Sequence, residues 1–149
     1  FRNVLEETGM PFSKEVEMVE IASKMDLFSI VYVAKPEEAA AMAKAGADAI
    51  IAHVGTTVGG SIGVTGAVCS MEEAAARCQS IFEAGRAINP NIFLLSHGGP
   101  INTPEDATKV NELTDAQGFV GASSLERMGV EESLTNLTRK FKKIPFFRK

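Results

Sequence analysis

The sequence has no tryptophan, one tyrosine, two histidines and two cysteines among its 149 residues. Cys69 and Cys78 are too few for a disulfide framework, and neither stands in a zinc-ligand pattern. Two isolated thiols are typical of a reducing compartment, so we expect a cytoplasmic protein. No apolar run approaches the roughly 18–20 residues of a membrane span, and no segment resembles a secretory signal. We therefore expect no membrane partner.

An excess of positive charge is also missing. The formal net charge is −4 and the pI is near 5.2, which argues against a nucleic-acid partner. Cations gather only near the end of the chain, where they complement the C-terminal end of a helix: Arg139, Lys140, Lys142, Lys143, Arg148 and Lys149. The hydrophobic and charged fractions, 45% and 23%, are those of an ordinary globular domain.

Helical and strand patterns alternate along the chain after an irregular start that ends at Pro11. Helices are predicted over residues 13–25, 36–45, 71–88, from 104 onward and over 130–143, and short strands over 27–33, 49–54, 92–96 and from 118. Ser70 with Glu73 forms a capping-box pattern before the third of these helices. Thr103 is the expected cap of the helix that begins at Pro104.

The predicted strands are short and continuously apolar, which is typical of a parallel sheet covered by helices. Four strands cannot close a (β/α)8 barrel, which takes about 200–250 residues. Polar residues and glycines gather after the strands, most densely after the last two, as in the phosphate sites of such barrels. We expect an α/β fold in which residues 1–149 form one domain, the C-terminal half of a TIM barrel, with the N-terminal half absent. An open doubly wound sheet is the alternative.

Both histidines, His53 and His97, fall at predicted strand ends. Each is a candidate catalytic acid or base near neutral pH, or a neutral donor to a developing oxyanion. A structural role remains the alternative for either one.

Two segments after the last strands are candidate phosphate- or carboxylate-binding sites. Gly98 and Gly99 let backbone N–H groups approach a ligand. Gly121, Ala122, Ser123 and Ser124 lead into a predicted short helix from Ser124 to Met128, whose N-terminus favours an anion. Arg127 is a candidate clamp for the same anion, although a surface ion pair explains it equally well.

The loop from Gly55 to Ser70 is longer than most strand-to-helix connections. Its small and polar residues favour a lid that closes over substrate, rather than a merely flexible loop: Thr57, Gly59, Gly60 and Ser61. Glu6 and Glu7 are the candidate magnesium (Mg²⁺) ligands, with helix capping as the alternative.

Several motifs in order resemble the phosphoenolpyruvate hydrolase-like TIM-barrel family, a domain also found C-terminally in plant tobamovirus-resistance proteins. The resemblance extends to about Ile144 and rests on residues 1–10, 15–18, 43–48, 52–55, 59–63, 97–100 and 118–127. It implies a complete barrel of about twice this length that acts on phosphoenolpyruvate or a similar small phosphorylated or keto acid, as a hydrolase or lyase.

Related barrels hold metal-binding acids mainly in the half that is absent here, so the resemblance leaves magnesium binding by this segment unsupported. We expect a small anionic substrate, a homo-oligomer, and little activity from the segment alone. The alternative is a non-catalytic protein-binding module related to the viral replication inhibitors.

Overall fold

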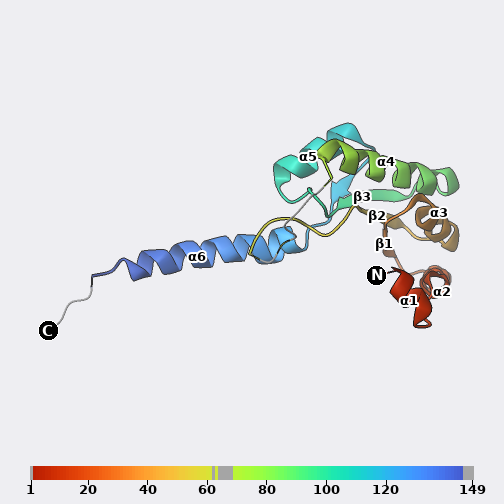
Figure 1. Cartoon of the computed structure of the whole chain (residues 1–149). Helices are drawn as coiled ribbons and strands as arrows, with labels where there is room; N and C mark the ends of the chain where they lie inside the picture. Colours follow the sequence, from red (N-terminus) through yellow and green to blue (C-terminus); the bar gives the residue numbers. More distant parts are fainter. Residues whose placement is uncertain (1, 62, 64–68, 146–149) are drawn as a thin grey trace.

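The computed structural model describes residues 2–61, 63 and 69–145. Helices and strands follow one another along the chain as α1 Arg2–Glu7, α2 Phe12–Lys24, β1 Ile30–Val33, α3 Pro36–Ala45, β2 Ala49–His53, α4 Met71–Ile88, β3 Phe93–His97, α5 Pro104–Leu113, β4 Gly118–Phe119, η1 Ser123–Arg127 and α6 Met128–Lys142 (Figure 1).

The strands form one parallel sheet in the order β1-β2-β3-β4. The predicted four-stranded parallel α/β fold is therefore confirmed. The register pairs Tyr32 with Ile51, and His53 with His97. Because side chains on one face of paired strands share a register row, the two histidines lie on the same face.

The two faces of the sheet have different surroundings. Helices α3, α4 and α5 cover one face, where the strands bury Val33, Ile50 and Leu94 against Phe82 of α4 (Figure 1). The opposite face carries exposed Ile30, Tyr32 and Phe93, as well as Phe28 from the turn before β1. Phe28 and Phe93 contact one another there, with ring centroids 6.2 Å apart. This side of the sheet is thus apolar and open around Ile30, Tyr32 and Phe93, although Ile51 on the same face is buried.

Predicted helix boundaries agree with the structure where capping residues set them. Ser70 accepts from the Glu73 N–H and Thr103 from the Asp106 N–H, and both capping boxes are complete. Gly46 ends α3 in the left-handed conformation, with φ of 99°.

Two predictions near the start of the chain were wrong. Residues 2–7 form α1 rather than an irregular segment, since the hydroxyl of Thr8 donates to the carbonyl of Val4 and the Met10 N–H to that of Leu5. The first strand begins at Ile30 rather than residue 27, because the Leu27 N–H bonds back to the carbonyl of Ala22 and Asp26 takes a positive φ of 57°.

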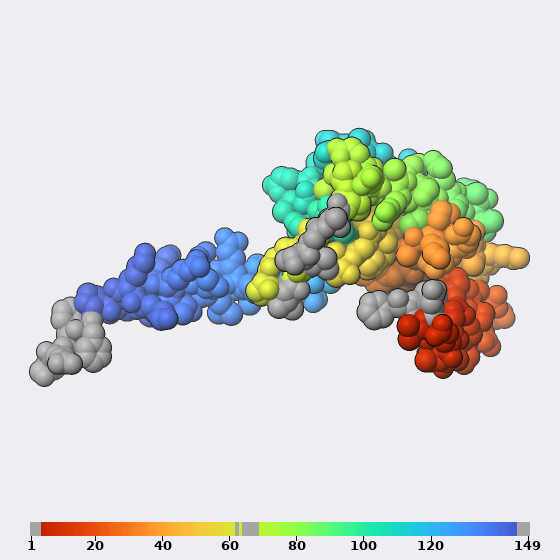
Figure 2. All heavy atoms as spheres, in the orientation of Figure 1, coloured from red at the N-terminus to blue at the C-terminus, as the bar shows by residue number. Residues whose placement is uncertain are grey.

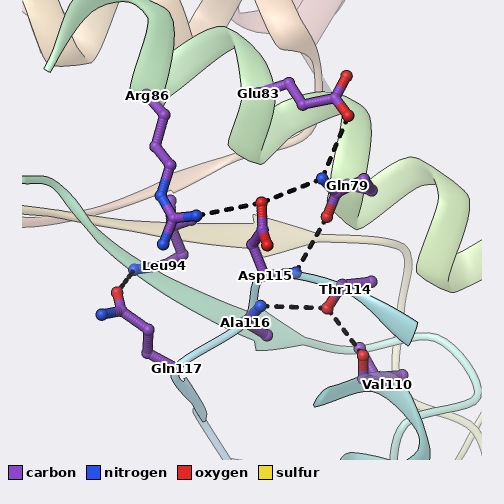
Figure 3. Close-up of polar contacts among 9 residues, drawn as sticks. All are labelled: Gln79, Glu83, Arg86, Leu94, Val110, Thr114, Asp115, Ala116 and Gln117. Atoms are coloured by element: carbon purple, nitrogen blue, oxygen red, sulfur yellow. Dashed lines mark hydrogen bonds and ion pairs between the residues drawn. The ribbon is translucent and has the colours of Figure 1, made fainter. Parts of the chain in front are cut away.

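A polar network holds β4 beside β3 (Figure 3). The Asp115 carboxylate accepts a hydrogen bond from Gln79 and forms an ion pair with Arg86 of α4, at 3.1 Å in each case, and the Asp115 N–H donates to the Gln79 side-chain oxygen. Gln117 then pairs with Leu94 through both its backbone N–H and its side-chain oxygen. The two-residue strand β4 is therefore fixed in register, and so is the segment that follows it.

Helix α6 extends away from the sheet and its covering helices (Figure 1). None of its side chains is buried. Among the described residues, no helix combines the length and apolar character needed to cross a membrane.

Candidate functional site

His53 and His97 lie side by side at the ends of β2 and β3, with ring centroids 5.0 Å apart. His97 is 8% exposed and His53 is partly buried. The sequence placed both at strand ends, and the parallel register brings them together. Two ionisable rings thus meet on the uncovered face of the sheet.

Nδ1 of His97 contacts a hydrogen-bond acceptor, whereas Nδ1 of His53 contacts a donor. Nδ1 of His97 lies 2.6 Å from the carbonyl oxygen of Val120, which can only accept, so this nitrogen carries a proton. Nδ1 of His53 accepts from the Gly55 N–H at 3.3 Å. In the neutral rings, Nε2 of His97 is therefore an acceptor and Nε2 of His53 is a donor.

Burial lowers the pKa of His53, and the neighbouring His97 lowers it further. A lowered pKa keeps the ring of His53 neutral at pH 7, which preserves the tautomer set by Gly55.

Tyr32 belongs to the same cluster, although it was not among the residues predicted from the sequence. Its ring contacts both histidines edge-on, with centroids 5.8 Å from His53 and 5.1 Å from His97. The strand period separates Tyr32 from Val31 and Val33, but its place beside His53 follows from the register of β1 with β2.

The glycines after β3 allow two loops to cross. Gly98 has a φ of 82°, and a Cβ there would collide with the carbonyl oxygen of Gly55. The Gly99 N–H donates to that same oxygen at 2.8 Å, and the Val58 N–H donates to the carbonyl of Gly99. The Gly99 N–H predicted for anion binding is therefore already bonded within the protein.

The second predicted anion-binding segment, Gly121–Ser124, begins directly after Val120, whose carbonyl contacts His97. Val120 orients His97, and Gly121 and Ala122 come next, before Ser123 and Ser124 in η1. The predicted short helix is a five-residue π-helical turn that begins one residue earlier and continues into α6. The Ala122 carbonyl accepts from the Glu126 N–H at 2.8 Å.

Arg127 and the described part of the predicted lid contact each other. Arg127 forms an ion pair with Glu131 at 3.2 Å and donates to the carbonyl of Gly59. Glu131 also accepts from the backbone and hydroxyl of Ser61, and these bonds lower its pKa. A Cβ on Gly60 would meet the Arg127 guanidinium. Arg127 is thus a tether for residues 59–61, and residues 62 and 64–68 of the predicted lid lie outside the described part of the chain.

Thr57, the remaining lid candidate, is buried although it lies in a loop. It precedes Val58, whose N–H donates to the carbonyl of Gly99 and whose own carbonyl accepts from the Asn102 side chain at 3.2 Å. The protein therefore holds this part of the loop through both backbone groups of Val58.

The magnesium candidates do not assemble a ligand set. Glu6 accepts from the Phe12 N–H at 2.8 Å and so caps the start of α2, and Glu7 is exposed in α1. Within residues 2–61, 63 and 69–145, no three His, Cys, Asp or Glu side chains are grouped as metal ligands. Cys78 is a poor candidate nucleophile, since it is buried in α4 and burial raises its pKa to about 12, with a further contribution from Cys69.

Three curated proteins are similar to this chain in sequence. Two are from tomato (Solanum lycopersicum), described as ToMV susceptible protein tm-1(GCR26) and ToMV resistance protein Tm-1(GCR237). Each is 48% identical over 145 residues, which is 97% of this chain and 19% of the tomato protein. The third, a putative transcriptional regulatory protein y4pA of Sinorhizobium fredii (strain NBRC 101917 / NGR234), is 34% identical over the whole chain and 24% of its own length. The chain spans about a fifth to a quarter of the length of these relatives.

Among solved structures, the N-acetylmannosamine-6-phosphate 2-epimerase of Clostridium perfringens is similar, with a TM-score of 0.50 and 17% identity. The likeness covers 87% of this chain and 48% of the epimerase, a TIM-barrel enzyme, and it bears on the fold alone. The sequence profile of the phosphoenolpyruvate hydrolase-like family matches residues 1–144. The described strands, helices and sequence relatives agree with that match, and the chain belongs to the phosphoenolpyruvate hydrolase-like family.

Proposed function

We propose that this chain is part of a TIM-barrel enzyme that moves a proton on a small keto or phosphorylated acid. The observation that carries the proposal is the histidine pair, in which His97 offers a proton acceptor and His53 a proton donor on one face of the sheet. Two imidazoles of opposite tautomer place a proton acceptor for a general base beside a hydrogen-bond donor for a developing oxyanion.

In this mechanism, Nε2 of His97 takes a proton from the carbon next to the carbonyl group. Nε2 of His53 donates a hydrogen bond to the carbonyl oxygen, where negative charge develops. The Val120 carbonyl stabilises the imidazolium that forms on His97, because it accepts from Nδ1 in both protonation states. The ring of Tyr32 packs against both imidazoles and restricts their rotation.

The acid group of the substrate is held after β4 in this proposal. The segment Gly121–Ser124 begins one residue beyond the carbonyl that orients His97, so an anion bound there lies near the reacting atoms. The hydroxyls of Ser123 and Ser124 are its candidate donors. No step is assigned to magnesium, because the described residues do not group three ligands for it.

The complete site needs further strands. The histidines lie on the apolar face that the described helices leave uncovered, and we propose that the first half of the barrel covers it in the longer protein. The segment alone is then expected to have little activity. A reducing compartment such as the cytoplasm suits the two free thiols.

The test uses a protein that carries this domain together with the strands that complete its barrel. Deuterium entry at the methyl group of pyruvate, followed by NMR in D₂O, reports proton abstraction without a need to know the final product. We expect His97→Gln to slow the exchange at least about 100-fold, within the range for a general base. Tyr32→Phe keeps the ring and is the matched control, with exchange close to the parent rate.

Thermal melting with phosphate, phosphoenolpyruvate and pyruvate tests the anion segment separately. Ser123→Ala with Ser124→Ala is expected to abolish a rise in melting temperature produced by any of these anions. Absence of both exchange and a melting shift in the parent protein would overturn the enzyme proposal.

A non-catalytic binding module is the second candidate. It is favoured by the likeness to the tomato proteins. A relative named for susceptibility and one named for resistance match this chain equally well, so the likeness does not distinguish resistance from susceptibility. If the chain is a binding module, His97→Gln leaves binding of a viral protein unchanged, whereas substitution of apolar side chains on the exterior of the barrel abolishes it.

A further inference from the structure

Helix α6 carries an apolar stripe that the rest of the described chain does not cover. The helix stands clear of the sheet and its helices (Figure 2). Leu134 is 60% exposed, and its neighbours along the stripe are similarly exposed: Val130, Leu137 and Phe141. Ile144 is also exposed and follows the end of the helix. An isolated apolar residue needs no explanation, but four on one side of a projecting helix indicate a contact surface.

The stripe has the spacing of a coiled-coil seam. Its members follow one another at intervals of four, three and four residues from Val130 to Phe141, and Ile144 continues the spacing just beyond the helix. This is the a and d pattern of a heptad repeat, which is narrower than the apolar face of a helix that packs on a globular core. The surface therefore fits another helix better than a sheet.

The base of α6 is fixed to the body. Arg127 reaches the carbonyl of Gly59, and Glu131 holds the backbone and hydroxyl of Ser61. These contacts set the direction in which the helix leaves the body, so the stripe beyond Val130 stays away from its own chain.

Charge along α6 points to the partner. Glu131 lies in its first turn and Glu132 directly follows, whereas Arg139, Lys140 and Lys142 lie in its last turn. A second copy that runs antiparallel places its basic half beside the acidic half of the first, and also opposes the helix dipoles. A parallel copy brings the basic halves together, which costs free energy.

We propose that α6 pairs antiparallel with α6 of a second copy of this chain. Val130 then faces Phe141 of the other copy, and Leu134 faces Leu137. The contact is the same in both copies, so it closes a two-fold dimer instead of a filament. Two heptads form a short seam, and we expect an association that depends on concentration within the range of sedimentation experiments.

The test is sedimentation velocity of the 149-residue chain over a range of concentrations. We expect twice the monomer mass of 15.9 kDa at high concentration. Leu134→Glu combined with Leu137→Glu should return the monomer. Asn136→Glu places the same charge on the polar side of α6 and should leave the dimer. Ile30→Thr with Phe93→Thr should also leave it, which separates α6 from the uncovered sheet face.

Cross-linking checks the direction of the helices, in a background where Cys69 and Cys78 are serine. A mixture of Val130→Cys and Phe141→Cys chains should form a disulfide between the two kinds of chain. Each variant alone should form few. A chain that stays monomeric at every concentration, or cysteines that join like positions, would overturn the proposal. Neither result depends on the enzyme activity.

Discussion

Gly98 has a left-handed backbone conformation and lies where the loops after β2 and β3 cross. Its positive φ and the Gly55 carbonyl leave no room for a side chain. We expect Gly98→Ala to cost about 2 kcal/mol or more of unfolding free energy, measured with urea, because the residue is strained and the loops must separate.

Gly129→Ala is the matched control for Gly98→Ala. Gly129 lies in α6, where an added Cβ would meet no atom within 4 Å, and alanine favours a helix. An equal loss at both positions would contradict the role given to the loop crossing.

Because the pKa of His53 is lowered, we expect the free energy of unfolding to depend on pH through this residue. Below pH 6.5, the ordinary pKa of histidine, His53 binds a proton in the unfolded chain. It binds that proton less readily in the folded chain, because burial and His97 disfavour the charged ring. The stability that His53 contributes is present above pH 6.5 and is lost as the pH falls through the folded pKa. Urea unfolding at pH 7.5 and 5.5 should therefore show a smaller loss in His53→Gln than in the parent chain. Identical losses in the two proteins would show that His53 titrates normally.

At the scale of elements, the tether between α6 and residues 59–61 can be tested locally. Exposed ion pairs add little to the global free energy of unfolding, so an unfolding experiment does not report on this tether. Glu131→Ala removes the acceptor for the Ser61 N–H, and we expect faster hydrogen exchange of that amide. Glu132→Ala, one position along α6, should leave the exchange rate unchanged. If Glu131→Ala leaves it unchanged as well, the tether does not protect the loop.

Elements whose ends are set by local chemistry could be predicted from the sequence. Ser70 and Thr103 begin their helices through contacts three residues away, and Gly46 ends α3 through its own φ. Helix α1 has comparable signals in Thr8 and Gly9, which follow its last turn. A six-residue helix has too few apolar positions to show a period, and for that reason it was missed.

The candidate site was predictable only in part, because pairing between strands is not a local property. The sequence places His53 and His97 at strand ends, but the distance between their rings follows from the register of β2 with β3. The partners of Nδ1 come from Gly55 and from Val120, which is 23 residues beyond His97. Likewise, the Gly99 N–H was expected to meet a ligand, and only the crossing of two loops shows its bond to Gly55.

At the scale of the whole molecule, the uncovered sheet face distinguishes a half-barrel from an open sheet that is complete in itself. Ile30 and Phe93 are 54% and 50% exposed on that face. Ile30→Thr with Phe93→Thr should change the unfolding free energy of the 149-residue chain by less than about 1 kcal/mol, since exposed side chains contribute little. The same pair should reduce fluorescence of a bound apolar dye, whereas Leu113→Gln, on the helical side, should not.

The result differs in a longer protein that contains the first half of the barrel. If that half covers this face as we propose, the two side chains lie in the barrel interior, and their replacement should cost several kcal/mol, about 2–5 for each large side chain. Urea unfolding of the two lengths, each with and without the substitutions, gives the comparison. A large cost in the longer protein alone means that other strands cover this face and complete the surroundings of His53 and His97. A small loss of unfolding free energy in both proteins means that the face stays open. In that case nothing excludes water from His97, which contradicts its proposed role as a general base.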